Sequence, residues 1–456
     1  MQLVTDKSPK LTIPFRYLFT GIAVLVAISI IIIFKAHALT GFFFRSAVFL
    51  PLTHLLTLGW ITLTIIGAMF QLIPVVTEKV LFSESIAKAV YYLYLAGLAW
   101  LIYAFASNTQ ADAGAGIISI AILLFLVDIA VTINPVRGQR HPAAGGGLQS
   151  PLASNGDSHG IEPPAVSNGV KDIQKPDLAV SYVIAAVLFL FLTIIIGSIA
   201  AAGLHQHMVD NPVTFLFLHI AVAGIGWVCF VVIGFSFRLI PMFILSHGYD
   251  ETYGWTSFAM LLSGLILLVL YFTLQLFIPG LNDIDWIGLA GGIIILIGII
   301  SYIFQMHVIY KQRTRRQIEP ALWFSICATA YLLVAGLIGV WMLAFQHSFR
   351  LEIVYVIAGL FGFAGMYIIG MMHKIVPFLH WYNKYSSKIG LEKVPMTKDM
   401  INTPFTWIQL FVFNAGIIII TAGIMANMTG IIVVSGIVFL TGSLLFLWNI
   451  ANVLRK

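Results

Sequence analysis

Twelve long apolar stretches, separated by short polar connections, dominate the chain. Each holds about 20 residues, the length that an α-helix needs to cross the roughly 30 Å hydrocarbon core of a membrane. They cover approximately residues 13–34, 46–72, 85–106, 113–134, 178–203, 213–240, 255–278, 285–310, 320–345, 350–376, 403–426 and 430–453. The pattern predicts an all-α integral membrane protein with twelve transmembrane helices.

The composition agrees with this prediction and excludes a soluble globular domain. Hydrophobic residues make up 60% of the 456 residues, charged residues only 9%, and the mean hydropathy is +0.99. A water-exposed surface needs far more charge. Both cysteines, Cys229 and Cys327, fall inside predicted helices, so neither a disulfide framework nor a Cys-x-x-Cys metal site is expected.

The basic residues are distributed very unevenly between the two sides of the predicted bundle. If the N-terminus lies inside, the outer loops hold only Lys35, Arg45 and Arg350, and the inner side holds the other 21 of the 24 Lys and Arg residues. The positive-inside rule then predicts a multi-pass protein of the plasma membrane with both termini cytoplasmic. The net charge of +6 reflects this topology, so the expected partner is the lipid bilayer and no nucleic acid.

Residues 135–177 form the one long polar segment, PVRGQRHPAAGGGLQSPLASNGDSHGIEPPAVSNGVKDIQKPD. Gly, Pro, Ser and Asn are frequent in it and large apolar residues are scarce, so a disordered cytoplasmic linker is expected. A second cytoplasmic connection, YKQRTRRQIEP, follows the eighth helix. These connections divide the chain into three four-helix blocks, 1–134, 178–319 and 320–456.

A sixteen-residue motif occurs once in the second helix of each block. The copies read GWITLTIIGAMFQLIP from Gly59, GWVCFVVIGFSFRLIP from Gly226 and GFAGMYIIGMMHKIVP from Gly362. They share the first Gly, an aromatic residue after it, Ile and Gly at the eighth and ninth positions, a Gln, Arg or Lys at the thirteenth, and a final Pro. This agreement indicates an internal structural repeat. The central Gly is expected to allow close helix contact and the final Pro to end each helix at the inner boundary.

Two histidines lie just upstream of the first two copies. His54 comes 20 residues before Pro74, and His219 comes 22 residues before Pro241. At 1.5 Å per residue both lie about 30 Å from the inner boundary, near the outer edge of the hydrocarbon. Each could be a hydrogen-bonded core histidine, but two imidazoles at one depth on different helices also suit axial haem ligation.

Other polar residues gather on the same outer side. The additional candidate ligands for a metal, copper or zinc, are His37, His205 and His207, while His347 is a further candidate for haem. The third motif copy has Ile357 and Tyr355 where the other two have histidine. Tyr355 lies one turn from Glu352, which predicts either an interfacial Tyr beside a Glu352–Arg350 pair or a proton-conducting, hydrogen-bonding side of the histidine site.

The three motif helices resemble the large catalytic subunit of the haem-copper oxidases. That family has twelve helices in three pseudo-threefold blocks of four, and its haem and copper histidines lie on helices 2, 6, 7 and 10. His54 matches the low-spin haem ligand on helix 2, and His219 falls on helix 6. The resemblance implies a b-type haem, with copper as a second candidate, and a redox partner or other membrane subunits.

The departures from that family exclude its oxygen-reducing centre. The tenth helix lacks His-x-His and the seventh lacks a His-His pair. What remains is similar to the NnrS-type proteins, haem- and copper-containing membrane proteins linked to nitric oxide stress. The expected function is electron transfer or the handling of nitric oxide or metals. A transporter or channel, or an assembly subunit without a ligand, is the alternative.

Overall fold

The computed structural model describes residues 10–40, 47–77, 79–133, 177–206, 211–278, 284–345, 347–389 and 391–456. Over these residues the protein is all-helical, and twelve helices are long and apolar enough to cross a membrane. The prediction of twelve membrane-spanning helices is confirmed. The predicted linker, apart from Asp177, lies outside the described residues.

The helices follow the chain in three groups. The first contains α1 (Thr12–Thr40), α2 (Phe49–His54), η2 (Leu55–Thr62), α3 (Leu63–Thr77), α4 (Glu84–Ser107) and α5 (Asp112–Ile133). The second contains α6 (Leu178–Gln206), α7 (Pro212–Ile220), η3 (Ala221–Cys229), α8 (Phe230–Ile244), α9 (Thr252–Phe277) and α10 (Asp285–Lys311). The third contains α11 (Pro320–Ala344), α12 (Phe349–Ile357), η4 (Ala358–Gly365), α13 (Met366–Tyr385), the short turns η5 (Ser386–Lys388) and η6 (Thr397–Met400), α14 (Thr403–Ala426) and α15 (Thr429–Val453).

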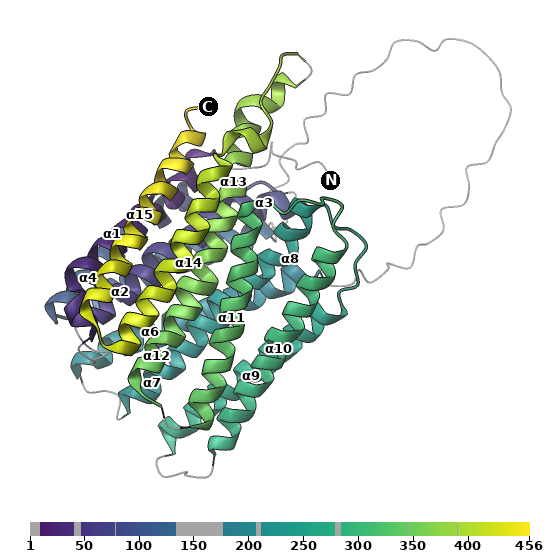
Figure 1. The fold of residues 1–456 in the computed structure, drawn as a ribbon. Coiled ribbons are helices and arrows are strands. Elements are labelled where there is room, and N and C mark those ends of the chain that lie inside the picture. The colour runs from purple at the N-terminus through teal and green to yellow at the C-terminus, as the bar shows by residue number, and fades with distance from the viewer. Residues whose placement is uncertain are drawn as a thin grey trace, which may run out of the picture.

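The three groups pack side by side (Figure 1), and contacts between the last helix of each group and the first helix of the next close them into a ring. Within each group the last two helices form a tight antiparallel pair, α4 with α5, α9 with α10 and α14 with α15. Between groups α5 packs on α6, α10 on α11 and α15 on α1. The helices that carry the motif meet inside this ring, where η4 contacts both η2 and η3 and the Trp227 indole donates to Thr62 Oγ1 at 3.1 Å.

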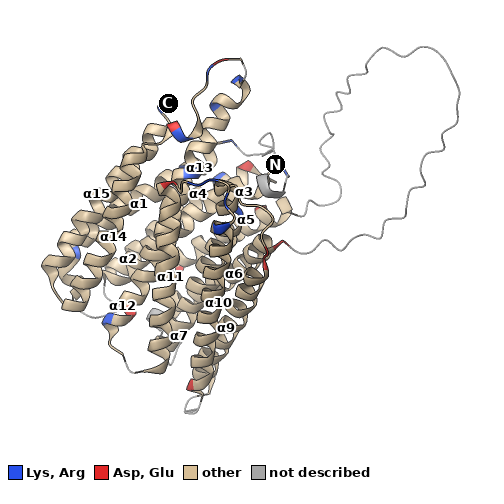
Figure 2. Ribbon diagram, turned by 45° about the vertical axis from the view of Figure 1, so that its right-hand side comes forward, with Lys and Arg blue, Asp and Glu red and all other residues tan. Residues whose placement is uncertain are grey.

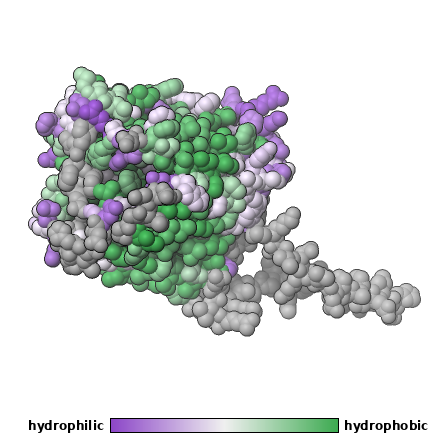
Figure 3. Space-filling model, turned by 90° about the horizontal axis from the view of Figure 1, so that it is seen from below, coloured by the Kyte–Doolittle hydropathy of each residue, from purple (hydrophilic) through white to green (hydrophobic). Residues whose placement is uncertain are grey.

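The surface matches a membrane-embedded bundle. Apolar side chains form a broad band across the molecule, with polar residues toward its edges (Figure 3). Large apolar residues stay exposed on this band, among them Leu188, Trp341 and Phe411. Lys and Arg gather at the end where α1 begins and α15 ends (Figure 2). The chain is therefore a multi-pass membrane protein.

Each motif helix contains a π-helical segment in its N-terminal half. These are η2, η3 and η4, and each one ends three residues after the first Gly of its motif copy. A π-helical turn accommodates an extra residue and is frequent at functional sites. The three segments therefore mark equivalent levels in the three helices.

The motif prolines do not end their helices, so that expectation was wrong. Pro74, Pro241 and Pro377 all lie inside helices, which end at Thr77, Ile244 and Tyr385. A proline removes one backbone hydrogen bond and crowds the carbonyl four residues earlier, which bends a helix without ending it when packing holds both sides. The third of these helices consequently extends well beyond the bundle (Figure 1).

The central motif glycines press against aromatic residues of the first helix in each group. A Cβ atom on Gly234 would lie 2.8 Å from Cβ of Tyr182, and one on Gly370 would lie 2.6 Å from Cβ of Phe324. Gly67 lies closer still to Cβ of Tyr17. The structure therefore has close helix–helix contacts at these three glycines.

A buried polar residue on the last helix of each group binds the start of the third helix. Asp128 Oδ1 accepts from Ser83 N, Gln305 Oε1 accepts from Gly254 N, and Asn449 Oδ1 accepts from Asn402 N. Each lies three residues after a buried aromatic residue, Phe125, Tyr302 or Phe446. These bonds satisfy backbone donors that a helix start leaves unpaired.

We expect Asp128→Asn to be tolerated and Asp128→Ala to be costly. Asn keeps the acceptor and matches the neutral amides in the other two groups, whereas Ala leaves the partly buried Ser83 N–H without a partner, which costs about 1–3 kcal/mol. Thermal unfolding in detergent measures the difference. Asp112→Ala, at the exposed start of the same helix, serves as control with an expected cost below about 1 kcal/mol. Equal destabilisation by Asn and Ala at position 128 would contradict the role.

Candidate functional site

His54 is the last residue of α2 and has a fixed tautomer. Its Nδ1 donates to the Leu50 carbonyl oxygen at 2.8 Å, one turn earlier in the helix. A neutral imidazole carries one N–H, so Nε2 holds the lone pair. The ring also lies 4.8 Å from the Phe105 ring, which limits its rotation. This is the arrangement in which metal-ligating histidines are commonly oriented.

His219 lies near the end of α7 and packs edge-on against α6. Its Nδ1 is buried and has no hydrogen-bond partner among the described residues. Gly197 makes room for the ring, because a Cβ atom at that position would lie 3.0 Å from His219 Cε1. A buried imidazole nitrogen without a partner is costly for structure alone, so it is a candidate donor for a ligand.

The two imidazoles lie in the N-terminal parts of two motif helices that contact each other. A positive charge on His54 would oppose one on His219, so the rings lie within electrostatic reach of each other. Their helices are held together about two turns further along by the Trp227–Thr62 hydrogen bond. His54 lies immediately before the π-helical segment η2, and His219 lies one residue further from the start of η3. Two neutral imidazoles on neighbouring helices form a donor set suited to axial ligation of haem iron.

His347 and Glu352 bind each other. The distance from His347 Nε2 to Glu352 Oε1 is 3.1 Å, and His347 Nδ1 lies 3.2 Å from the Phe345 carbonyl oxygen. Glu352 thus has a partner that the sequence analysis did not name, while Arg350 donates to the Met425 carbonyl. Both nitrogens of His347 are engaged, so His219 is the better candidate for a second ligand. Tyr355 packs against Gly339 of α11.

The other candidate metal ligands are not brought together by the described residues. His37 is exposed near the end of α1. His205 is in the last turn of α6, where side chains lie outside the described residues, and His207 lies outside them altogether. Within the described ranges no three His, Cys, Asp or Glu side chains form a group that could hold a metal ion.

His373 is a buried histidine that the sequence analysis did not single out. It is 2% exposed, its Nδ1 donates to the Ile369 carbonyl at 2.7 Å, and its Nε2 lies 2.7 Å from the side-chain amide of Gln409. The ring stacks on Phe324 at 5.8 Å. The signal was in the motif, because the same position holds Phe70 and Phe237 in the other two copies.

The hydrogen bonds of His373 determine its tautomer. With the proton on Nδ1, Nε2 can only accept, so the Gln409 amide must present its nitrogen to the ring. That orientation also gives a partner to the Gln409 amide nitrogen, which otherwise has none in the described structure. His373 is therefore satisfied by protein atoms, in contrast to His219.

The chain matches no protein-family model and no curated protein. Its twelve membrane-length helices define it as a multi-pass membrane protein. Within that class, His54 keeps the lone pair on Nε2, and His219 has a buried Nδ1 without a partner among the described residues, so both are candidate donors for a ligand.

Proposed function

We propose that the protein is a haem-binding integral membrane protein in which His54 and His219 are the axial ligands. It acts in electron transfer or in the handling of nitric oxide or metals, not in oxygen reduction at a haem-copper centre. One observation carries the proposal: of the histidines on two contacting motif helices, His54 is oriented by a backbone carbonyl and His219 has a buried ring nitrogen with no partner in the described structure. A bound haem, of the b type, would supply one-electron chemistry, and a diatomic gas could coordinate it only in place of one of the two histidines.

The chain's own residues would prepare this site in three ways. The Leu50 carbonyl fixes the tautomer of His54 and raises the basicity of Nε2. Gly197 leaves room for the His219 ring. The apolar surroundings of both rings exclude water from the region where a ligand would bind.

The proposed architecture is the pseudo-threefold arrangement of three four-helix blocks found in haem-copper oxidase subunit I. Three repeated features support it: the π-helical segments, the glycine–aromatic contacts, and the polar residues that bind the third helix of each group. The cyclic packing of α5 on α6, α10 on α11 and α15 on α1 is what such a frame requires. On this frame the histidine site is asymmetric, because the third group has Tyr355 and Ile357 instead.

Copper is the second candidate for the same site. It would need a third ligand beyond His54 and His219, and the described side chains supply none. That ligand would have to come from His205 or His207, which follow Gly197 on α6 and in the connection after it. Haem needs only the two histidines, whereas copper needs a third donor, so the available donors favour haem over copper.

No observation favours a transporter. Coupled transport usually relies on membrane-embedded ionisable groups, and the sequence offers Asp128 and Glu352 as candidates. Both have structural partners, Ser83 N–H for Asp128 and His347 for Glu352. The proposal also includes partner membrane subunits or a redox protein, which the family resemblance implies.

The absorption spectrum of the full-length protein tests the proposed function. The protein is purified in detergent from haem-replete cells, and haem is then added in excess and the unbound fraction removed. A sharp Soret band at about one haem per chain supports the proposal. Absence of a Soret band after both treatments contradicts it and leaves the non-catalytic assembly subunit.

The proposed location is the plasma membrane. In the proposed orientation both termini and the 135–177 linker are cytoplasmic. The gathering of Lys and Arg at the end where α1 begins supports it (Figure 2). A protease site inserted near Asn155 should be cut only after the cytoplasmic side is opened. A matched site near Asn282, in an outer connection, should be cut in intact spheroplasts. The reverse pattern would invert the topology.

A further inference from the structure

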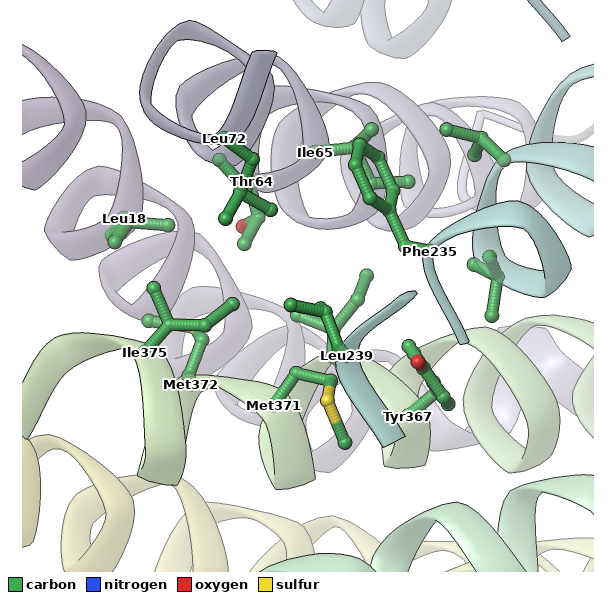
Figure 4. Close-up of a pocket in the computed structure, with 14 residues that line it drawn as sticks. Leu18, Thr64, Ile65, Leu72, Phe235, Leu239, Tyr367, Met371, Met372 and Ile375 are labelled. Atoms are coloured by element: carbon green, nitrogen blue, oxygen red, sulfur yellow. The ribbon is translucent and has the colours of Figure 1, made fainter. Parts of the chain in front are cut away.

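A cavity of about 50 Å³ lies between the three motif helices α3, α8 and α13, at the centre of the bundle (Figure 4). Residues from the same motif positions of all three helices line it. Ile65, Val232 and Ile368 occupy the seventh motif position, and Ala68, Phe235 and Met371 occupy the tenth. These positions share one helix face, which explains why they meet at a common axis.

The cavity arises from a size difference at the tenth motif position. Phe235 and Met371 reach toward the axis, whereas Ala68 carries only a methyl group (Figure 4). The backbones cannot close over the gap, because Gly67 and Gly370 already hold α3 and α13 against the aromatic residues of α1 and α11. The tenth motif position holds a small residue in α3 and large residues in the other two helices, so space is left at the axis.

The wall of the cavity is entirely apolar, although Thr64 and Tyr367 belong to it. Both contribute carbon atoms to its surface. The Thr64 hydroxyl lies against Gly21 of α1, and the hydroxyls of Thr64 and Tyr367 are buried without a hydrogen-bond partner in the described structure. A buried water needs about two to four polar partners, and this wall offers none. Water is thus a poor occupant, and a small apolar molecule is a good one.

We propose that this cavity binds a small uncharged gas molecule of the diatomic class. Its volume of about 50 Å³ is near one third of the ~150 Å³ apolar cavity that accepts benzene or xenon, so an aromatic ring or a lipid tail is too large. Diatomic gases partition into hydrocarbon and reach the centre of the bundle from the bilayer. The inference concerns a site separate from the histidine pair and stands without haem.

Xenon serves as the probe, in xenon-pressurised crystals or by xenon NMR of the full-length protein in detergent. The wild-type protein is expected to bind one xenon atom between α3, α8 and α13. Ala68→Leu fills the cavity and is expected to abolish this binding. Val232→Ile is the second variant, to be used if Ala68→Leu does not fold. It adds a single methylene group and is expected to weaken xenon binding at least about tenfold.

Two matched substitutions on the lipid-facing surface complete the test. Ala89→Leu and Val180→Ile add the same groups at exposed positions and should leave xenon binding unchanged. Xenon bound equally well by wild type, Ala68→Leu and Val232→Ile would overturn the proposal. Ordered water or continuous lipid density in the wild-type cavity would do the same.

Discussion

The His54→Ala variant is expected to lose its haem, with a fall of at least about tenfold in Soret absorbance per chain. Removing even an outer partner of a metal ligand costs about 10–100-fold in affinity, and His54 is proposed as a ligand itself. Ala also removes the ring that the Leu50 carbonyl orients. Haem content of the detergent-purified variant, measured against protein concentration, gives the result.

The companion variant His219→Ala is expected to retain less haem and to shift the bands of what remains. Loss of one of two axial nitrogens converts a six-coordinate haem into a five-coordinate one, which is open to a diatomic gas. His307→Ala, on the exposed side of α10, serves as the matched control. Unaltered haem content and band positions in both the His54 and His219 variants would rule the assignment out.

His373→Ala separates a ligand from a structural histidine. This ring is satisfied by Ile369 and Gln409, so its loss should reduce stability by about 1–3 kcal/mol while the bands stay in place. A spectral shift in this variant would move the haem site to the inner half of the bundle. An unchanged spectrum leaves His54 and His219 as the ligands.

The Gly370→Ala variant is expected to be strongly destabilised and to be recovered in low yield. The new Cβ atom would lie 2.5 Å from the Ala321 carbonyl oxygen, which belongs to a helix backbone and cannot move aside alone. Overpacking of this kind costs about 1–3 kcal/mol or more. The measurement is the fraction of folded protein after detergent extraction, together with its thermal midpoint.

Gly359→Ala is the matched control for that prediction. Gly359 lies in the preceding η4 segment of the same membrane-spanning helix, and a Cβ atom there would meet no atom within 4 Å. This variant should fold with the stability of the wild type. Equal stability of the Gly370→Ala and Gly359→Ala variants would show that the close contact between α13 and α11 does not require glycine at position 370.

Hydropathy predicted the twelve helices because crossing a membrane is a property of each segment alone. A run of about 20 apolar residues satisfies its own backbone hydrogen bonds in any surroundings. The positions of His54 and His219 near one level were predictable for the same reason, since depth follows from spacing along a single helix. Which atoms each ring contacts depends on neighbouring helices, so the Leu50 and Gly197 contacts could not be predicted.

Other features could not be predicted for the same reason, because they depend on contacts between helices. His373 reads as a basic residue near the membrane boundary when its helix is taken alone, but α11, α14 and α15 enclose it. Pro377 reads as a helix end, yet packing on both sides carries α13 past it. The shared role of Asp128, Gln305 and Asn449 escapes notice because three different residue types perform it and only the geometry makes them equivalent.

The π-helical segments let each long membrane-spanning helix rotate its two halves independently. His54 precedes its motif glycine by five residues and His219 precedes its own by seven, although the two π-helical segments end at the same motif position. An extra residue in a wide turn changes the angular register of everything beyond it, while the glycine contacts further in stay unchanged. The inner half of the bundle can thus remain constant through insertions or deletions, while the outer half is free to exchange one set of side chains for another.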